Sequence, residues 1–183
     1  MIKFKTTEIV IGQHPNKSLG TKFHLTDILL TIIMFPFRIV NLFNKGYTSL
    51  SDSDWELMFS TIEFKIEKRL VALTGFDNCI VFYNLSSTDK KLNEVIRGKV
   101  FGNFICKTDS GIFLRQFKSP KDWPNSKLVY IGFDNYKIMT VSKSDSSWVD
   151  WTCNSIADNQ IDILTEHRPG YSKILRINQT QTN

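Results

Sequence analysis

The chain has 183 residues, of which 42% are hydrophobic and 22% are charged, and this balance excludes an intrinsically disordered protein and fits one domain with a full core. Aromatic residues make up 13% of the chain, which favours strands over helical bundles. The net charge of +5 is dispersed, and no zinc-finger, helix-turn-helix or RNA-binding pattern accompanies it, so the sequence does not support nucleic-acid binding.

The first fifty residues combine a strand pattern with an apolar segment. Residues Lys3–Gly12, KFKTTEIVIG, partly alternate and predict a short strand. The most apolar part of the chain, Phe23–Lys45, follows a turn-rich connector. Its uncharged run, Ile28–Phe37, would span about 15 Å as a helix, roughly half of a bilayer core.

This segment allows three interpretations: a helix buried against the protein or a partner, a signal or uncleaved anchor, and a helix that lies on a membrane surface. We expect a retained helix over Ile28–Phe43, because a charge at either end opposes a bilayer span and no small-residue cleavage motif follows. The predicted domains are therefore an apolar helical segment, residues 1–50, and a β domain, residues 51–183.

Beyond residue 51, short apolar runs alternate with turn clusters, and this spacing predicts one antiparallel meander over Asn78–Cys153. One of its strands is expected across Asn93–Lys107. In the run IFLRQF, Arg115 is expected on the solvent face, opposite Ile112 and Leu114. The meander is followed by a predicted helix over Ile156–His167, a stop at RPG, and a last strand in YSKILRI.

A meander has two exposed edges unless it closes into a barrel. Three segments carry a resemblance to the lipocalin family: SDWELMF from Ser53, FDNY from Phe133, and DNQIDILTEHRPGYSKILRI from Asp158. The resemblance implies a mostly-β fold in which the meander closes into a lipocalin-like barrel. It also implies that Trp55 is buried at the base of that barrel.

Known chemical motifs are absent from the sequence. His14, His24 and His167 lack the spacing of a metal site, and no nucleophile-base pattern is recognisable. We therefore expect no catalytic residue, metal or cofactor, and a binding protein rather than an enzyme. Cys79, Cys106 and Cys153 allow either one disulfide with one free thiol or three reduced thiols.

The predicted function is binding of a small apolar ligand inside the barrel. The alternative is an interaction protein with a solid barrel, which docks on a membrane or a protein partner, or on a second copy, through Ile28–Phe43. The sequence leaves membrane association, secretion and a cytoplasmic location open. Trp123 and Trp148 could stack on a ligand or pack in a core. The residues expected to line the ligand cavity are Ile80, Phe82, Val100, Ile112, Leu114, Leu128, Tyr130, Ile138 and Trp151.

Overall fold

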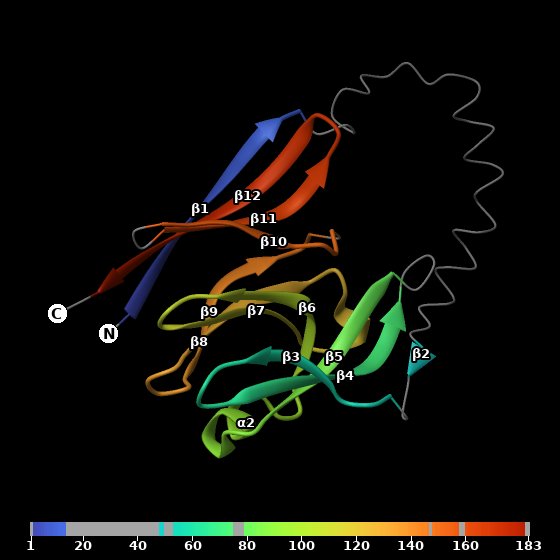
Figure 1. Ribbon diagram of the computed structural model, residues 1–183. Helices are drawn as coiled ribbons and strands as arrows, with labels where there is room; N and C mark the ends of the chain where they lie inside the picture. Colours follow the sequence, from blue (N-terminus) through green and yellow to red (C-terminus); the bar gives the residue numbers. More distant parts are fainter. Residues whose placement is uncertain are drawn as a thin grey trace.

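The structure is a computed structural model that describes residues 2–13, 48–49, 53–74, 79–146, 148–157 and 160–181. Within these residues the chain forms antiparallel strands in two sheets and one α-helix (Figure 1). The elements are β1 (Ile2–Gly12), β2 (Thr48–Ser49), β3 (Glu56–Ser60), β4 (Lys65–Thr74), β5 (Ile80–Ser87), α2 (Lys90–Ile96), β6 (Val100–Lys107), β7 (Gly111–Phe117), a 3-10 turn (Pro120–Asp122), β8 (Ser126–Gly132), β9 (Ile138–Ser144), β10 (Thr152–Ala157), β11 (Gln160–Arg168) and β12 (Tyr171–Gln181).

The larger sheet has the order β2-β4-β5-β6-β7-β8-β9, and β3 pairs with the same strand, β4, as β2 does. The smaller sheet has the order β1-β12-β11-β10. Its first strand, β1, runs antiparallel to the last strand of the chain, with Ile2 opposite Gln181, so the two ends of the chain lie near each other (Figure 1). The strand predicted at Lys3–Gly12 is confirmed, and the strands β5 to β9 confirm most of the predicted meander.

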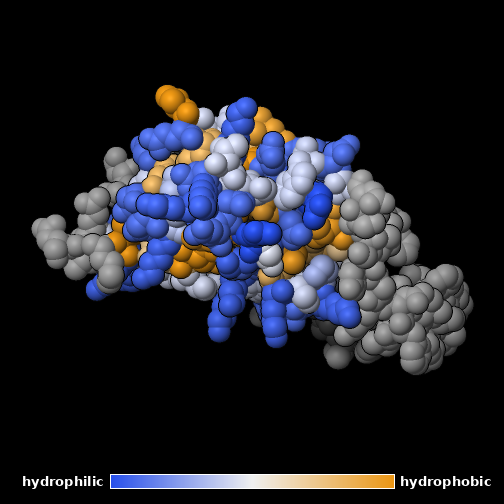
Figure 2. All heavy atoms as spheres, turned by 90° about the horizontal axis from the view of Figure 1, so that it is seen from below, coloured by the Kyte–Doolittle hydropathy of each residue, from blue (hydrophilic) through white to orange (hydrophobic). Residues whose placement is uncertain are grey.

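The two sheets and the helix form three layers (Figure 1). Strands β7 and β8 lie in the middle layer and are buried on both faces, which explains why their sequences are apolar runs rather than clean alternations. Ile112 and Leu114 pack with α2 on one face, whereas Phe113 packs against the small sheet on the other. The α2 side of the molecule presents mostly hydrophilic side chains to solvent (Figure 2).

The predicted strand over Asn93–Lys107 is wrong in its first residues, because a helix precedes it. The side chain of Asp89 caps this helix by accepting a hydrogen bond from the N–H of Leu92, at 2.8 Å. Leu92 and Ile96 are four residues apart, so they share one helix face, and both are fully buried in the core below the large sheet. The prediction relied on the alternation of apolar and polar residues in this run, whereas the spacing of Leu92 and Ile96 is that of a helix.

The C-terminal helix predicted over Ile156–His167 is also wrong, since β11 occupies Gln160–Arg168. Ile161, Ile163 and Thr165 are β-branched, and their spacing of two residues places all three on the buried face of a strand. The meander also ends earlier than predicted. Cys153 lies on β10, which belongs to the small sheet.

The predicted barrel closure is wrong. Within the part of the chain that the structure describes, β2 and β9 end the large sheet and are not paired with each other. The expected burial of Trp55 is wrong as well, because its side chain is 42% exposed and lies under the guanidinium of Arg69, 5.0 Å from the ring centroid. The small sheet, rather than barrel closure, covers the second face of β7 and β8.

The helix predicted over Ile28–Phe43 falls outside the described residues, so it stays a prediction. In the described ranges, no helix has the length and apolar character needed to cross a membrane.

A disulfide joins the two sheets, and an ion pair joins two strands of the small sheet. Cys106 on β6 is disulfide-bonded to Cys153 on β10, with Cα atoms 5.9 Å apart, whereas Cys79 is a free, exposed thiol. In the small sheet, Arg176 donates to both carboxylate oxygens of Asp162, at 2.9 and 2.7 Å. These hydrogen bonds lower the pKa of Asp162 below its ordinary value of 3.8.

Alkylation of the denatured protein without a reductant should modify one cysteine, Cys79, and alkylation after reduction should modify all three. The disulfide closes a loop of 47 residues, so its reduction should lower the free energy of unfolding by about 4 kcal/mol. Peptide mass mapping and urea unfolding measure the two effects. Three modified cysteines in the unreduced protein would contradict this pairing.

The Asp162→Asn variant should lose about 1 kcal/mol of stability at pH 7, because a charge-assisted pair in a partly exposed position is replaced by a weaker one. The pKa of Asp162 is lower in the folded than in the unfolded chain. The pair therefore stabilises the protein above about pH 4, and this contribution is lost as the pH falls through the folded-state pKa. Urea titrations should show the difference in stability between the variant and the parent shrinking as the pH falls below about 4. The exposed Asp109→Asn is the control, and a difference that stays constant with pH would contradict the assignment.

Candidate functional site

A cavity of about 270 Å³ lies where the large sheet opens between β5 and β6. Its walls come from both of these strands, from β7, from the residue after the 3-10 turn, and from the connection between β9 and β10. The lining is mixed, with aliphatic, aromatic, polar and charged side chains. The lining residues are Cys79, Ile80, Val81, Tyr83, Gly102, Asn103, Arg115, Phe117, Trp123, Val149 and Asp150.

The opening exists because β5 and β6 pair at only two positions, Tyr83 with Phe101 and Asn84 with Val100. Past Phe101, the register between β6 and β7 is also shifted. The second half of β6 turns toward the small sheet, where Phe104 packs on Trp151 and Cys106 is disulfide-bonded. The two strands therefore diverge, and side chains from both faces of the sheet reach the cavity.

Gly102 allows the floor of this opening to lie close to β7. A Cβ atom at this position would approach the ring of Phe117 to 3.2 Å and the side chain of Arg115 to 3.8 Å. An added Cβ would therefore require the ring of Phe117 to shift by a few tenths of an ångström, whereas its contact with Arg115 would be an ordinary one.

Arg115 is the charged group of the inner wall, and only 3% of its surface is exposed. Its Nε–H donates to the Ser126 hydroxyl at 3.1 Å, while Nη1 and Nη2 donate to the carbonyl oxygens of Trp148 and Ser146, both at 2.6 Å. The guanidinium also lies 4.2 Å from the ring centroid of Trp151 and 5.1 Å from that of Phe117.

No Asp or Glu among the described residues lies within ion-pair distance of Arg115. Burial lowers the pKa of its guanidinium to about 10, so the group still carries its charge at neutral pH. Carbonyl dipoles and aromatic faces therefore offset a full positive charge that has no carboxylate partner in the described part of the chain.

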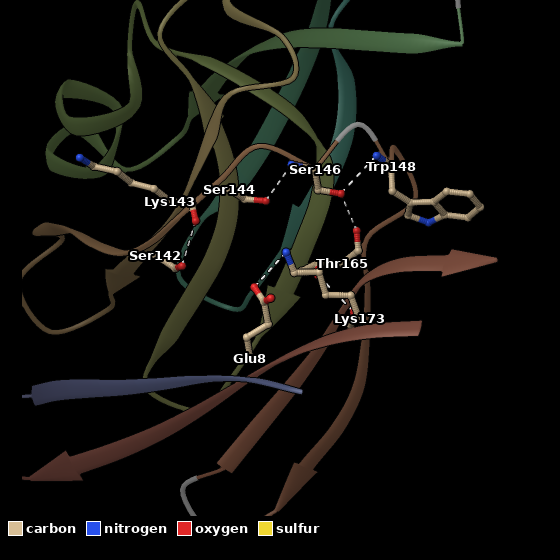
Figure 3. A network of polar contacts seen from close by, with 8 residues as sticks. All are labelled: Glu8, Ser142, Lys143, Ser144, Ser146, Trp148, Thr165 and Lys173. Atoms are coloured by element: carbon tan, nitrogen blue, oxygen red, sulfur yellow. Dashed lines mark hydrogen bonds and ion pairs between the residues drawn. The ribbon is translucent and has the colours of Figure 1, made fainter. Parts of the chain in front are cut away.

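The same connection between β9 and β10 is bound to the small sheet, as Figure 3 shows. The hydroxyl of Ser146 donates to the carbonyl of Thr165 on β11 at 2.9 Å and accepts from the N–H of Trp148 at 3.2 Å. Nearby, Lys173 on β12 pairs with Glu8 on β1 at 2.9 Å. The segment that accepts hydrogen bonds from Arg115 is thus bound to both sheets.

The rim carries further polar groups. Lys68 donates to Asn103 at 3.1 Å and lies 4.7 Å from the ring centroid of Tyr83. Burial, and to a lesser extent the charge of Glu56, raise the pKa of Tyr83. Asp150 is exposed, so water screens its charge far more than that of the buried guanidinium.

Trp123, on the wall of the cavity, carries an unsatisfied donor. Its indole Nε1–H is buried and has no hydrogen-bond partner among the described residues. A buried donor of this kind normally finds a partner. The indole N–H of Trp151, in the core between the sheets, is likewise buried and has no hydrogen-bond partner among the described residues.

A second hollow, of about 420 Å³, lies at the ends of β7, β8 and β9. Lys118, Lys127, Lys143 and Asp145 line it, and all four are exposed. Water already solvates these charges, so this hollow has less to gain from a ligand than the cavity at Arg115.

The residues predicted to line one cavity are divided among three cores. Ile112, Leu114 and Ile138 pack on the α2 side, and Leu128, Tyr130 and Trp151 pack between the sheets. Ile80, Phe82 and Val100 belong to a third cluster beside the opening, and of the nine residues Ile80 lines the cavity described above.

Sequence reasoning missed the role of Arg115, which is buried rather than on the solvent face. One signal was present: a single arginine within the apolar run of β7, followed further along the chain by two tryptophans, Trp148 and Trp151. Of these, Trp151 is buried in the inter-sheet core, and Trp148 packs against that core.

The described residues contain no group of three or more His, Cys, Asp or Glu side chains that could hold a metal ion. Comparisons of the chain with protein-family models, with curated proteins and with solved structures found no match. The resemblance to lipocalins therefore stays a prediction from short motifs.

The Arg115→Met variant should lower the free energy of unfolding by about 3 kcal/mol, because the carbonyls of Ser146 and Trp148 lose their donors inside the protein. The exposed Arg97→Met variant, in the turn after α2, is the matched control and should change stability by less than about 0.5 kcal/mol. Denaturant unfolding measures both. Equal losses in the two variants would show that the hydrogen bonds of Arg115 do not stabilise the fold.

Proposed function

We propose that this protein binds a small ligand that carries an anionic group, without a chemical step, in the cavity between β5 and β6. The observation that carries the proposal is the buried guanidinium of Arg115 in the cavity wall, since no carboxylate of the described residues lies within ion-pair distance of it and Asp150, which also lines the cavity, is exposed to solvent. A bound anion would supply the missing countercharge in a place where water screens it little.

The hydrogen bonding of Arg115 leaves room for such a ligand. Three of the five N–H groups of an arginine are used here, one on each nitrogen, so each terminal nitrogen keeps one further donor. Carboxylate and phosphate oxygens match paired donors of this type. The side chain of Trp123 adds an aromatic wall to the same cavity.

The remaining walls favour an apolar ligand body. Ile80, Val81, Phe117 and Val149 line the cavity together with the ring of Trp123. A volume of about 270 Å³ lies just below the range of roughly 300–1,000 Å³ that is usual for ligand pockets. The ligand is therefore smaller than a typical drug molecule. The proposal keeps the binding function expected from the sequence, but it changes the ligand from wholly apolar to amphipathic and places it in the sheet opening.

The disulfide between Cys106 and Cys153 bears on where this binding takes place. Disulfides that join core elements persist in oxidising compartments, so we propose that the protein works outside the reducing cytosol.

Benzoate or hexanoate should raise the thermal unfolding midpoint, whereas benzamide and hexanamide should not, because the amides lack the charge that Arg115 requires. At a ligand concentration of about 100 times Kd, stabilisation should reach about 2.7 kcal/mol, or roughly 5–10 °C for a chain of this size. The measurement is thermal unfolding followed by tryptophan fluorescence.

The Arg115→Met variant should lose the carboxylate effect and the Arg97→Met variant should keep it. If Arg115→Met does not fold, the comparison of acid with amide on the parent protein still decides the question. Equal shifts with acids and amides, or no shift with either, would exclude an anion site at Arg115.

A further inference from the structure

A row of polar side chains crosses three neighbouring strands at one end of the large sheet. Gln116 on β7 lies opposite Lys127 on β8, and Lys127 lies opposite Lys143 on β9. Directly opposed residues of antiparallel strands project from the same face of the sheet, with Cβ atoms about 4.5–5.5 Å apart. The two lysines are therefore neighbours, and both line the second hollow, of about 420 Å³, together with Lys118 at the end of β7.

The charges of these three lysines are not neutralised by ion pairs. Like charges that face each other across two strands destabilise the pairing. None of the ion pairs found among the described residues includes Lys118, Lys127 or Lys143. In Figure 3 the side chain of Lys143 points away from the polar network that joins the two sheets. A bound anion would therefore relieve a repulsion that no ion pair in the described part of the chain offsets.

Two carboxylates also line this hollow, but each interacts with another group. Asp122 accepts a hydrogen bond from the hydroxyl of Ser119 at 2.6 Å. Burial lowers the pKa of Lys173, whereas its hydrogen bond to Glu8, the charge of Glu8 and then the charge of Asp145 raise it, so Asp145 acts on a cation of the small sheet. The two carboxylates would repel a broad anionic surface such as a membrane, whereas a small anion can contact the lysines alone.

The exposure of the lysines determines how many charges the ligand needs. A single exposed ion pair contributes little, but several charges that act together on one partner contribute more. The hollow, at about 420 Å³, lies within the range of roughly 300–1,000 Å³ that is usual for ligand pockets. It therefore has room for a small molecule that carries more than one anionic group.

From these observations we infer that the hollow at the ends of β7, β8 and β9 binds a small, soluble polyvalent oxyanion, with two or more phosphate or sulfate groups. Lys127 and Lys143 contact the ligand from adjacent strands, and Lys118 supplies a third cation. This site is separate from the cavity at Arg115, and the inference does not rest on the proposed function.

The test is isothermal titration of the full chain with tripolyphosphate and with orthophosphate at equal ionic strength. Tripolyphosphate should bind at least about tenfold more tightly, because it reaches several lysines at once. Its binding should also weaken severalfold when the salt concentration rises from about 0.05 M to about 0.2 M, since the lysines are exposed. Equal affinities for the two anions, or no binding of tripolyphosphate, would overturn the inference.

Matched variants locate the ligand. Lys127→Gln and Lys143→Gln should each weaken tripolyphosphate binding about threefold to tenfold. Neither should lower the melting temperature of the unliganded protein, because each removes a repulsion between opposed lysines. The control is Lys137→Gln, which changes an exposed lysine just before β9, at the other end of the same strand pair, and should leave the affinity unchanged.

A fourth variant tests the sign of the interaction. Asp145→Asn removes a negative charge from the hollow and should tighten tripolyphosphate binding about twofold to threefold. Equal affinities of Lys127→Gln, Lys143→Gln and Lys137→Gln for tripolyphosphate would contradict the placement of the anion in this hollow. Weaker binding by Asp145→Asn would contradict it as well.

Discussion

A buried guanidinium without a carboxylate partner must obtain its hydrogen bonds elsewhere, and this constraint organises the centre of the molecule. Arg115 on β7 donates hydrogen bonds to two backbone carbonyls in the connection between β9 and β10. In this connection the chain passes from the large sheet to the small one. The hydroxyl of Ser146 extends the same network to Thr165 on β11. The position of the crossing segment, and with it the packing of the two sheets, therefore depends on a charge that lies between them.

The two-layer arrangement of sheets follows from the sequences of β7 and β8. Both strands have apolar side chains on consecutive positions, so neither face of the large sheet can lie in water at its centre. The small sheet covers one face, and α2 covers the other together with Phe64, Ile66 and Leu85. A closed barrel would have buried one face only, which is why the layered solution replaces it here.

The cavity arises from an irregularity in otherwise regular pairing. Strand β6 starts beside β5 and ends beside β10, where the disulfide at Cys106 and the contact between Phe104 and Trp151 hold it. A strand that contacts both sheets must diverge from its first partner, which here is β5. The space between the diverging strands is lined by side chains from both faces of the large sheet. Gly102 lies at this departure, where an added Cβ would come within 3.2 Å of the ring of Phe117.

The sequence by itself determined the local features of this protein. Alternation of apolar and polar residues, with turn clusters between the runs, was sufficient to predict the antiparallel strands β5 and β7 to β9 and the first strand of the chain, because a period of two residues and a turn are encoded by neighbours. Where a helical and a strand pattern overlap in the sequence, tertiary contacts determine which one forms. Leu92 and Ile96 lie on a helix because both side chains pack into the core on the α2 side of the large sheet. Ile161 and Ile163 lie on a strand because both side chains pack into the core between the sheets. Arg115 could not be placed from the sequence, since its partners lie 11 to 33 residues away and are mostly backbone carbonyls, which every residue carries. The cavity could not be predicted from the sequence either, because it is formed by the divergence of two strands. That divergence depends on which sheets the later part of the chain forms.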